Sequence, residues 1–528
     1  MTVLALAGLL AVTAYSLATL TRFPVLYGDE SWIGSTAWSF VAGHGYRPSI
    51  AVGGGVYDHG ALDYWLPRLG TAPFVAADLI AGPSFWALRF TAFLIGVAAI
   101  VIFVLALRTR HGLPVAMTAG LALAATWGFL GSSHYVRWDS LAFAVACALL
   151  YVLIRGTPTR RTALLLGLLF GLLPDIEAAI LAAVPAALLL LMWERRDRFA
   201  RLGMLAGGMV GGAVLYVILH AFPFGRDDGQ YAAVYAPAYR IPLREVLHQR
   251  SLDAIWGEKL RYHFMKIAYP ADRLGFYTLM LGLAASVVVV AALRWRRKYP
   301  QHLVPGLLLA SHLGGLALIE PNKAPIHAWY ALPYAYGAMT EALVVLTSPL
   351  LRAAPSARVW LPAGFLAALA LVQFQRVRDV VRLTPKEPIF SAAFRAEAAG
   401  AVKPSDSIVG DYIYWWGFKD VNYHWNSWIW NYRWSHRTPL APAFNRLCPD
   451  VVLYDDVWNS RYPQAASFGR RFPSMAPTDP AEQGQLRRLL VREYRLERND
   501  VIDGRRIEFW RRKPGACDGI LTNGGGTA

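Results

Sequence analysis

The sequence predicts a polytopic α-helical membrane protein with about eleven transmembrane helices in residues 1–375, followed by a smaller α/β domain in residues 376–528. Of the 528 residues, 55% are hydrophobic and only 16% are charged, and the mean hydropathy is +0.34. This composition is too apolar for an average soluble domain. From Arg376 onward, however, the composition becomes that of an ordinary soluble protein.

The apolar stretches are each about as long as a membrane span. The first, Thr2 to Leu20, lacks the basic start and the cleavage site of a signal peptide, so we expect a retained helix. The stretch 161–174 is short, which indicates a tilted or half-inserted helix or a merger with its neighbour. The predicted spans are 2–20, 85–107, 112–131, 139–155, 161–174, 176–194, 201–221, 274–293, 303–320, 329–350 and 357–375.

Basic residues lie in alternate connections between these spans, which predicts that those connections face the cytoplasm. The basic connections contain Arg108 and Arg110; Arg155, Arg160 and Arg161; Arg195, Arg196, Arg198 and Arg201; Arg294, Arg296, Arg297 and Lys298; and Arg352 and Arg358. The outward set is then 21–84, 132–138, 175, 222–273, 321–328 and the C-terminal domain. This pattern explains much of the net charge of +17 and argues against nucleic-acid binding.

The C-terminal part shows strand and turn signals. Strands are predicted at 407–410 and 450–454, and a hairpin is predicted from 489–499 and 505–511 around Asp503-Gly504. Cys448 and Cys517 lie in this part, where an exported location would permit a disulfide; two free buried thiols are the alternative.

Two adjacent carboxylates, Asp29 and Glu30, follow the first span closely. Carboxylates near hydrocarbon are energetically expensive and are usually functional, although an acidic pair in a wet loop can also be simply solvated. The order of residues that follows favours function: Ala37, then Gly43-His-Gly-Tyr46, then His59-Gly-Ala-Leu-Asp-Tyr-Trp-Leu66.

This order resembles the bacterial protein-mannosyltransferase-like branch of the GT-C glycosyltransferases, which includes the aminoarabinose transferases of lipid A. In that branch an Asp-Glu pair follows the first helix, and a Lys-Pro-Pro-Leu-x-Tyr-Trp-Leu segment comes later. Here His59-Gly-Ala replaces Lys-Pro-Pro. The resemblance implies that His59 substitutes for the lysine as a phosphate ligand, and Asp58 matches an acidic position that can bind metal in relatives.

Two further outward turns carry the resemblance. Arg137-Trp-Asp139 resembles a polar cluster at the start of the family's fourth helix, and an arginine fork matches phosphate oxygens. Asp139 fits equally well as a charge at a helix N-terminus. Lys323, with Tyr330-Ala-Leu-Pro333, resembles the Lys-x-x-x-Tyr-x-Leu-Pro signature with looser spacing. The resemblance implies that Lys323 and Tyr330 bind donor phosphate; a lysine that snorkels to headgroups is the alternative.

Two groups of residues are weaker candidates. In the loop 222–273, Glu258-Lys-Leu-Arg261-Tyr-His263 loosely resembles a family element, which implies phosphate binding by Arg261 and metal binding by His263; an interfacial helix is the alternative. Residues 411–434 contain eleven aromatics. Trp415, Trp416 and Trp425 in this segment are typical either of a belt at a membrane interface or of a platform that stacks on the acceptor.

The resemblance implies a GT-C glycosyltransferase that moves a sugar from a polyprenyl-phosphate donor to a glycan, lipid or protein acceptor, with inversion at the anomeric carbon. Asp29 would be the general base, Glu30 would position it or the acceptor, and Asp58 with His263 could hold a divalent metal ion. A transporter or flippase of lipid-linked sugars, or a scaffold protein, is the competing class. The distinctive charges lie in outward loops and no internal repeat is evident, which favours the enzyme.

Overall fold

The computed structural model divides into two compact units. It describes residues 1–23, 28–43, 45–46, 67–156, 158–193, 197–221, 270–293, 301–318, 325–350, 357–384, 389, 392–426, 429, 438–455, 480–502 and 505–516. Unit 1 comprises Met1–Pro24, Leu66–Phe224 and Gly229–Thr384, and unit 2 comprises Val25–Trp65, Gly225–Asp228 and Pro385–Ala528. The segment 25–65, which carries the acidic pair, therefore groups with the C-terminal part of the chain.

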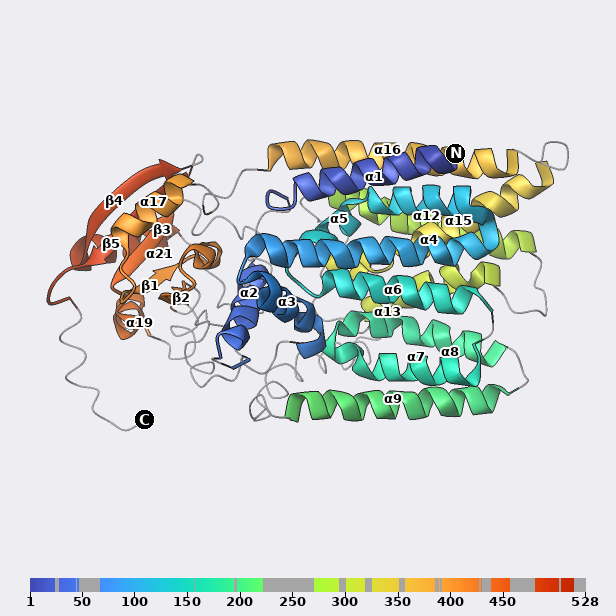
Figure 1. Ribbon diagram of the computed structural model, residues 1–528, viewed down its shortest axis with the longest axis horizontal. Coiled ribbons are helices and arrows are strands. Elements are labelled where there is room, and N and C mark those ends of the chain that lie inside the picture. The colour runs from blue at the N-terminus through green and yellow to red at the C-terminus, as the bar shows by residue number, and fades with distance from the viewer. Residues whose placement is uncertain are drawn as a thin grey trace. The chain divides into compact units, whose positions relative to one another are not determined.

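Unit 1 is a bundle of helices (Figure 1). Its elements are α1 (Thr2–Ala18), α3 (Arg68–Ala81), α4 (Phe85–Ala124), α5 (Trp127–His134), α6 (Asp139–Ile154), α7 (Arg160–Leu172), η2 (Leu173–Asp175), η3 (Ala178–Ala183), α8 (Val184–Trp193), α9 (Arg198–Ala221), α12 (Pro270–Leu293), η5 (Gln301–Leu303), α13 (Val304–Leu318), α14 (Pro325–Trp329), α15 (Leu332–Leu350) and α16 (Ala357–Leu383). Every predicted span overlaps one of these helices, so the apolar stretches are helical as expected.

Among the described residues, four helices are both long and apolar enough to cross a membrane: Phe85–Ala124, Arg198–His220, Leu274–Ala291 and Val359–Leu383. Shorter apolar helices cover Thr2–Ala18, Asp139–Ile154 and Ala178–Trp193. Many large apolar side chains on these helices are exposed in the isolated chain, for example Val3, Val217 and Leu371. Such faces suit contact with lipid.

One predicted helix boundary coincides with a break inside α4, and two others differ from the structure. The backbone of Gly112 leaves the helical region (φ 76°, ψ 166°) and so breaks α4 where a connection was expected. The predicted span 112–131 is interrupted because the Thr126 hydroxyl accepts a hydrogen bond from the Phe129 amide at 3.2 Å and starts α5. At the end of unit 1, α16 continues past residue 375, since buried Val377 and Val381 extend its apolar stripe.

Three of the five predicted cytoplasmic connections, those around Arg110, Arg155 and Gln301, meet at one end of the bundle. Arg110 forms an ion pair with Glu341 at 2.7 Å and donates a hydrogen bond to the Gln301 side chain at 2.6 Å. His302 also contacts the fully buried Glu341, at 2.6 Å, and the Gln301 amide donates to the Arg155 carbonyl at 3.2 Å. Connections far apart in sequence thus share one end, as the alternating arginines predict.

Helices α7 and α9 cross at glycines spaced four residues apart, Gly167 and Gly171 on α7 and Gly208 and Gly212 on α9. A Cβ atom added at Gly208 would lie 2.2 Å from the Leu164 carbonyl oxygen. At each of these four positions the nearest obstacle is backbone of the opposite helix, which cannot move aside cheaply. This is the small-residue packing typical of helices in membranes.

We expect Gly208→Ala to destabilise the protein by about 1–3 kcal/mol, because the added methyl group pushes the two backbones apart. The neighbouring Gly207 offers a matched control, since nothing lies within 4 Å of an added Cβ there. Thermal unfolding in detergent should give a lower midpoint for Gly208→Ala and an unchanged or slightly higher one for Gly207→Ala. Equal midpoints for the two variants would contradict the close crossing.

The described residues of unit 2 form a five-stranded mixed sheet with strand order β2-β1-β3-β5-β4. Strand β1 is parallel to β2 and β3, whereas β5 is antiparallel to β3 and β4. The elements are α2 (Gly28–Val41), α17 (Ala392–Ala401), β1 (Ser407–Gly410), η7 (Tyr412–Gly417), β2 (Asn422–Trp425), α19 (Leu440–Leu447), β3 (Val451–Asp455), α21 (Pro480–Glu493), β4 (Tyr494–Ile502) and β5 (Arg505–Arg512).

The predicted strands of the C-terminal part are present as β1, β3, β4 and β5. The first hairpin strand begins at Tyr494 rather than at residue 489, because Leu489 and Leu490 belong to helix α21 and are buried against the sheet. The turn at 503–504 lies outside the described residues. Cys448 is disulfide-bonded, whereas Cys147 is a free buried thiol and Cys517 lies outside the described residues.

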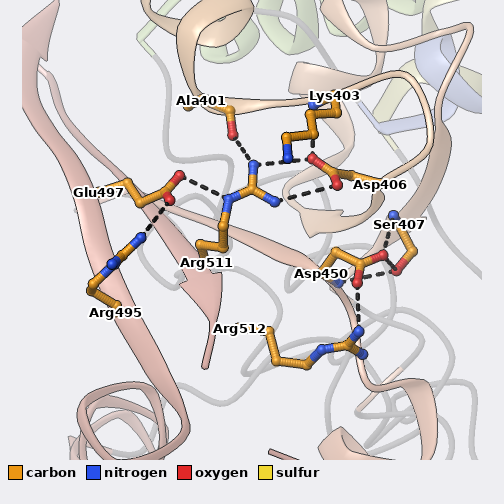
Figure 2. A network of polar contacts seen from close by, with 9 residues as sticks. All are labelled: Ala401, Lys403, Asp406, Ser407, Asp450, Arg495, Glu497, Arg511 and Arg512. Carbon is orange, nitrogen blue, oxygen red and sulfur yellow. Dashed lines mark hydrogen bonds and ion pairs between the residues drawn. The ribbon is translucent and has the colours of Figure 1, made fainter. Parts of the chain in front are cut away.

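A polar network ties the end of β5 to the loop between α17 and β1, as Figure 2 shows. Arg511 donates hydrogen bonds to Asp406 at 3.1 Å, to Glu497 at 2.9 Å and to the Ala401 carbonyl at 2.6 Å. Arg512 donates to Asp450 at 2.7 Å, and Asp450 in turn accepts from the Ser407 amide and hydroxyl. The two arginines therefore join three separate stretches of unit 2.

Low pH should lower the folding stability of unit 2. Burial acts to raise the pKa of Asp406, but hydrogen bonds from Arg511 and Lys403 outweigh it and hold the pKa below its usual value. Because the folded pKa is depressed, this carboxylate stabilises the fold above the unfolded-state pKa of about 4, and that stability is lost as the pH falls. Hydrogen-exchange protection of β3 and β5, corrected for intrinsic rates, should fall between pH 7 and pH 3. The loss of protection should be smaller in Arg511→Met, which lacks the arginine that lowers the pKa of Asp406. An identical loss in the variant and the wild type would contradict this role of Asp406.

Candidate functional site

The acidic pair lies in the first turn of helix α2 in unit 2, not in a loop. The helix forms because buried Ile33 and Ala37 lie four residues apart and share one face with Glu30. Carboxylates in a first helical turn are favoured by the helix dipole. Glu30 is fully buried, whereas Asp29 keeps partial exposure. Asp29 is therefore the member of the pair that a reactant can reach more readily.

Helix α2 packs against the aromatic turn η7. The indole nitrogen of Trp416 donates a hydrogen bond to the Ser31 hydroxyl at 2.9 Å, next to Glu30. Trp415 has no exposed surface, and its ring lies 4.8 Å from that of Trp416. Trp425 is partly buried and packs edge-on against Tyr412 at 5.4 Å.

Trp415 is thus an interior ring of unit 2, and its role at a membrane interface or an acceptor stays a prediction. Neighbouring aromatics are also internal: Tyr414 stacks on Phe394, and Tyr423 stacks on Phe418. Much of the aromatic density in 411–425 is therefore packing within unit 2. Trp416 connects this packing to the helix that carries the acidic pair.

A second polar group lies in unit 1, at the end of the bundle opposite the arginine-rich connections. Arg137 forms an ion pair with Asp139 at 3.3 Å, and the Tyr330 hydroxyl donates a hydrogen bond to the same carboxylate. Asp139 and Tyr330 are fully buried, whereas 14% of the Arg137 side chain is exposed. The Arg137 guanidinium also lies 5.3 Å from the Trp138 ring centre. The arginine is thus oriented by its neighbours while remaining accessible.

Glu177 and His327, which no sequence motif indicated as site residues, join this group. The Trp138 indole donates a hydrogen bond to Glu177 at 3.0 Å, and His327 lies 4.0 Å from the same carboxylate. The His327 carbonyl in turn accepts from His312 at 3.0 Å. Glu177 was hidden in a predicted span, 176–194. The signal that could have found it is the cost of a carboxylate inside an apolar stretch.

Asp175 forms a further buried contact. Its carboxylate accepts hydrogen bonds from the backbone amides of Arg68 at 2.8 Å and Leu69 at 2.9 Å, and so caps the first turn of α3. His220 at the end of α9 contacts the same carboxylate at 2.7 Å. From the predicted outward connections, residues 132–138, Asp175 and the described part of 321–328, residues 325–328, therefore lie together at one end of unit 1.

The other predicted site residues, His59, Asp58, Arg261, His263 and Lys323, lie outside the described residues. Within the part of the chain that the structure describes, no group of three His, Cys, Asp or Glu side chains is arranged to hold a metal ion. A divalent ion at Asp58 and His263 thus stays a prediction.

Taken together, apolar helices with lipid-suited faces and a charged cluster at one end of the bundle define a polytopic membrane protein with a polar site beside the bilayer. Residues 58–220 match the family model described as dolichyl-phosphate-mannose-protein mannosyltransferase. This match confirms, over that stretch, the resemblance to the protein-mannosyltransferase-like GT-C family. It includes Arg137, Asp139, Asp175 and Glu177.

Comparison with solved structures gives matches at low identity. The structure of ArnT from Cupriavidus metallidurans bound to undecaprenyl phosphate is 15% identical, with 96% of this chain and 97% of that chain covered and a TM-score of 0.46. The Archaeoglobus fulgidus oligosaccharyltransferase tethered with an acceptor peptide is 14% identical, with 87% and 70% covered and a TM-score of 0.47. A comparison with curated protein sequences gives no match.

Proposed function

We propose that this protein is an inverting GT-C glycosyltransferase that moves a sugar from a polyprenyl-phosphate donor to an acceptor hydroxyl on the outer face of a bacterial cytoplasmic membrane. The observation that carries the proposal is the family match over 58–220, together with the oriented Arg137 that lies within it. The orientation in the membrane follows from the arginine-rich connections at the opposite end of the bundle.

In the proposed reaction Asp29 is the general base. The acceptor oxygen attacks the anomeric carbon while its proton passes to the Asp29 carboxylate, and the bond from that carbon to the phosphate oxygen breaks. Polyprenyl phosphate leaves with the electron pair of that bond. The partial exposure of Asp29, beside the fully buried Glu30, supports this assignment. Glu30 is then the residue that holds the first turn of α2 in place.

Negative charge grows on the departing phosphate oxygen, so the donor side of the site needs fixed cationic donors. Arg137 meets this need because Asp139 and the Trp138 ring orient its fork, and Tyr330 secures Asp139 in turn. Lys323, Arg261 and His59 are proposed as further phosphate ligands from the family resemblance. A divalent ion at Asp58 and His263 is proposed on the same basis, and no step above depends on it.

Mass spectrometry of lipids and glycans from cells with and without this chain tests the proposal. One sugar modification should disappear with the chain, return with the wild type, and stay absent with Asp29→Asn at equal expression. Purified wild-type protein should also bind undecaprenyl phosphate, the probe for the donor lipid. If Asp29→Asn and Glu30→Gln both restore the modification fully, transport of a lipid-linked sugar becomes the better explanation. If no lipid or glycan changes, the proposed function is wrong.

A further inference from the structure

The backbone that leads from α1 toward the acidic pair is held by hydrogen bonds from distant parts of unit 1. The fully buried Arg89 donates to the Leu20 carbonyl at 2.7 Å. The ring of His134, also fully buried, contacts the Phe23 carbonyl through Nδ1 at 2.6 Å. These donors come from α4 and from the end of α5, 69 and 111 residues further along the chain.

A third tether comes from within the segment itself. Arg22 donates to the carbonyls of Arg382 at 3.0 Å and Thr384 at 3.2 Å. These carbonyls belong to the last turn of α16 and the residue after it, where backbone acceptors lack partners inside the helix. A cation is also favourable at a helix C-terminus. The segment 20–23 is thus fixed to α4, to α5 and to the end of α16.

His134 has its tautomer set by these contacts. A carbonyl oxygen can only accept, so Nδ1 must carry the proton that it donates to Phe23. Nε2 is then the acceptor for the hydroxyl of the buried Ser16 on α1. The neutral ring is therefore held from both sides, between helix α1 and the segment that follows it. Edge-to-face packing of Phe23 against Trp127, with ring centres 4.4 Å apart, adds to the restraint.

The contacts that hold residues 20–23 lie close in sequence to the proposed catalytic base. Asp29 follows Phe23 by only six residues, a length that spans at most about 20 Å. After the segment 25–65 the chain continues in unit 1, where Asp175 caps the amides of Arg68 and Leu69. Within unit 1, buried polar side chains therefore hold the backbone at residues 20–23, before this segment, and at residues 68–69, after it.

We propose that His134 is a positioning residue for the transfer reaction: its Nδ1–H fixes the Phe23 carbonyl and thereby the point from which the chain departs toward Asp29. This inference rests on the proposed function for its catalytic consequence. The tether itself does not depend on that function, because its contacts are made whatever the reaction is.

Two substitutions of His134 separate this role from simple packing. In His134→Asn the side-chain amide nitrogen can take the place of Nδ1 and still donate to Phe23. In His134→Gln the longer side chain reaches toward the Nε2 position beside Ser16 and leaves the Phe23 carbonyl without its donor. Both variants replace the same buried ring with a neutral amide, so they share the cost of losing its packing.

Three measurements on the full-length protein test the proposal: hydrogen exchange of peptides covering 20–41, binding of undecaprenyl phosphate, and formation of the sugar modification in cells at equal expression. We expect His134→Gln to raise exchange in 20–41 and to lower product formation by roughly 10- to 100-fold, the scale of a small misplacement of a reacting group. Undecaprenyl phosphate should bind equally to both variants. His134→Asn should stay close to wild type in all three measurements.

The outcomes distinguish the tether from the reaction. Unchanged exchange in His134→Gln, or equal loss of product in both variants, would overturn the positioning role. So would a parallel loss of undecaprenyl phosphate binding in His134→Gln, since that indicates a general disturbance of unit 1. If exchange rises only in His134→Gln but the wild type forms no product, the tether stands and the proposed function fails.

Discussion

Replacement of Asp29 by Asn is expected to slow product formation by about 10²–10⁴-fold, the usual contribution of a general base. Asparagine keeps the size of the side chain and most of its hydrogen bonding but cannot accept the acceptor's proton. Binding of undecaprenyl phosphate should be unchanged, because an acceptor base makes little contact with the leaving phosphate. Product formation in cells and lipid binding by purified protein measure the two effects separately.

Glu30→Gln is the control for loss of charge in the same helical turn. Glu30 is fully buried, so its substitution should act on the stability of α2 more than on the chemical step. If Glu30→Gln abolishes product while Asp29→Asn keeps near-normal levels, Glu30 is the base and the assignment must move by one residue. If both variants are active at wild-type rates, the acidic pair takes no part in the reaction.

The helical bundle could be predicted because apolar stretches of membrane length are a local property of the sequence. The strands at 407–410 and 450–454 were equally visible, since β-branched runs between turn residues are local too. The boundaries were less predictable. The cap at Thr126 that ends one apolar stretch early, and the buried Val377 and Val381 that prolong another, depend on neighbours that composition does not reveal.

In the candidate site, too, some features were predictable from local sequence and others depend on distant residues. Arg137 and Tyr330 were visible from short motifs, but their shared contact with Asp139 joins residues 191 positions apart. The cap that Asp175 forms on α3 joins residues 107 apart and has no local signature. The aromatic segment shows the opposite problem. A buried tryptophan such as Trp415 and a tryptophan at a membrane interface look the same in the sequence. Only the packing in the folded structure distinguishes them.

Replacement of Arg137 by Lys is expected to weaken binding of undecaprenyl phosphate by about 10-fold or more, because a lysine keeps the charge but cannot make the paired hydrogen bonds of the arginine fork. Lysine is preferred to alanine as the test. Alanine would leave the buried Asp139 carboxylate without its cation, and breaking a buried pair in this way typically costs about 3–5 kcal/mol of stability. A loss of binding in Arg137→Ala could then reflect unfolding.

Arg155→Lys provides the matched control at the opposite end of the bundle. Arg155 donates a hydrogen bond to the Tyr151 hydroxyl at 2.6 Å and is exposed, so the same change there alters a cation without touching the outward cluster. Undecaprenyl phosphate should bind Arg155→Lys as it binds the wild type, at equal thermal stability. The affinity of Asp139→Asn for undecaprenyl phosphate should lie between those of Arg137→Lys and Arg155→Lys, because Arg137 keeps its charge and loses only the partner that orients it. Wild-type affinity in Arg137→Lys would remove this arginine from the donor site and leave phosphate binding to the loops outside the described residues.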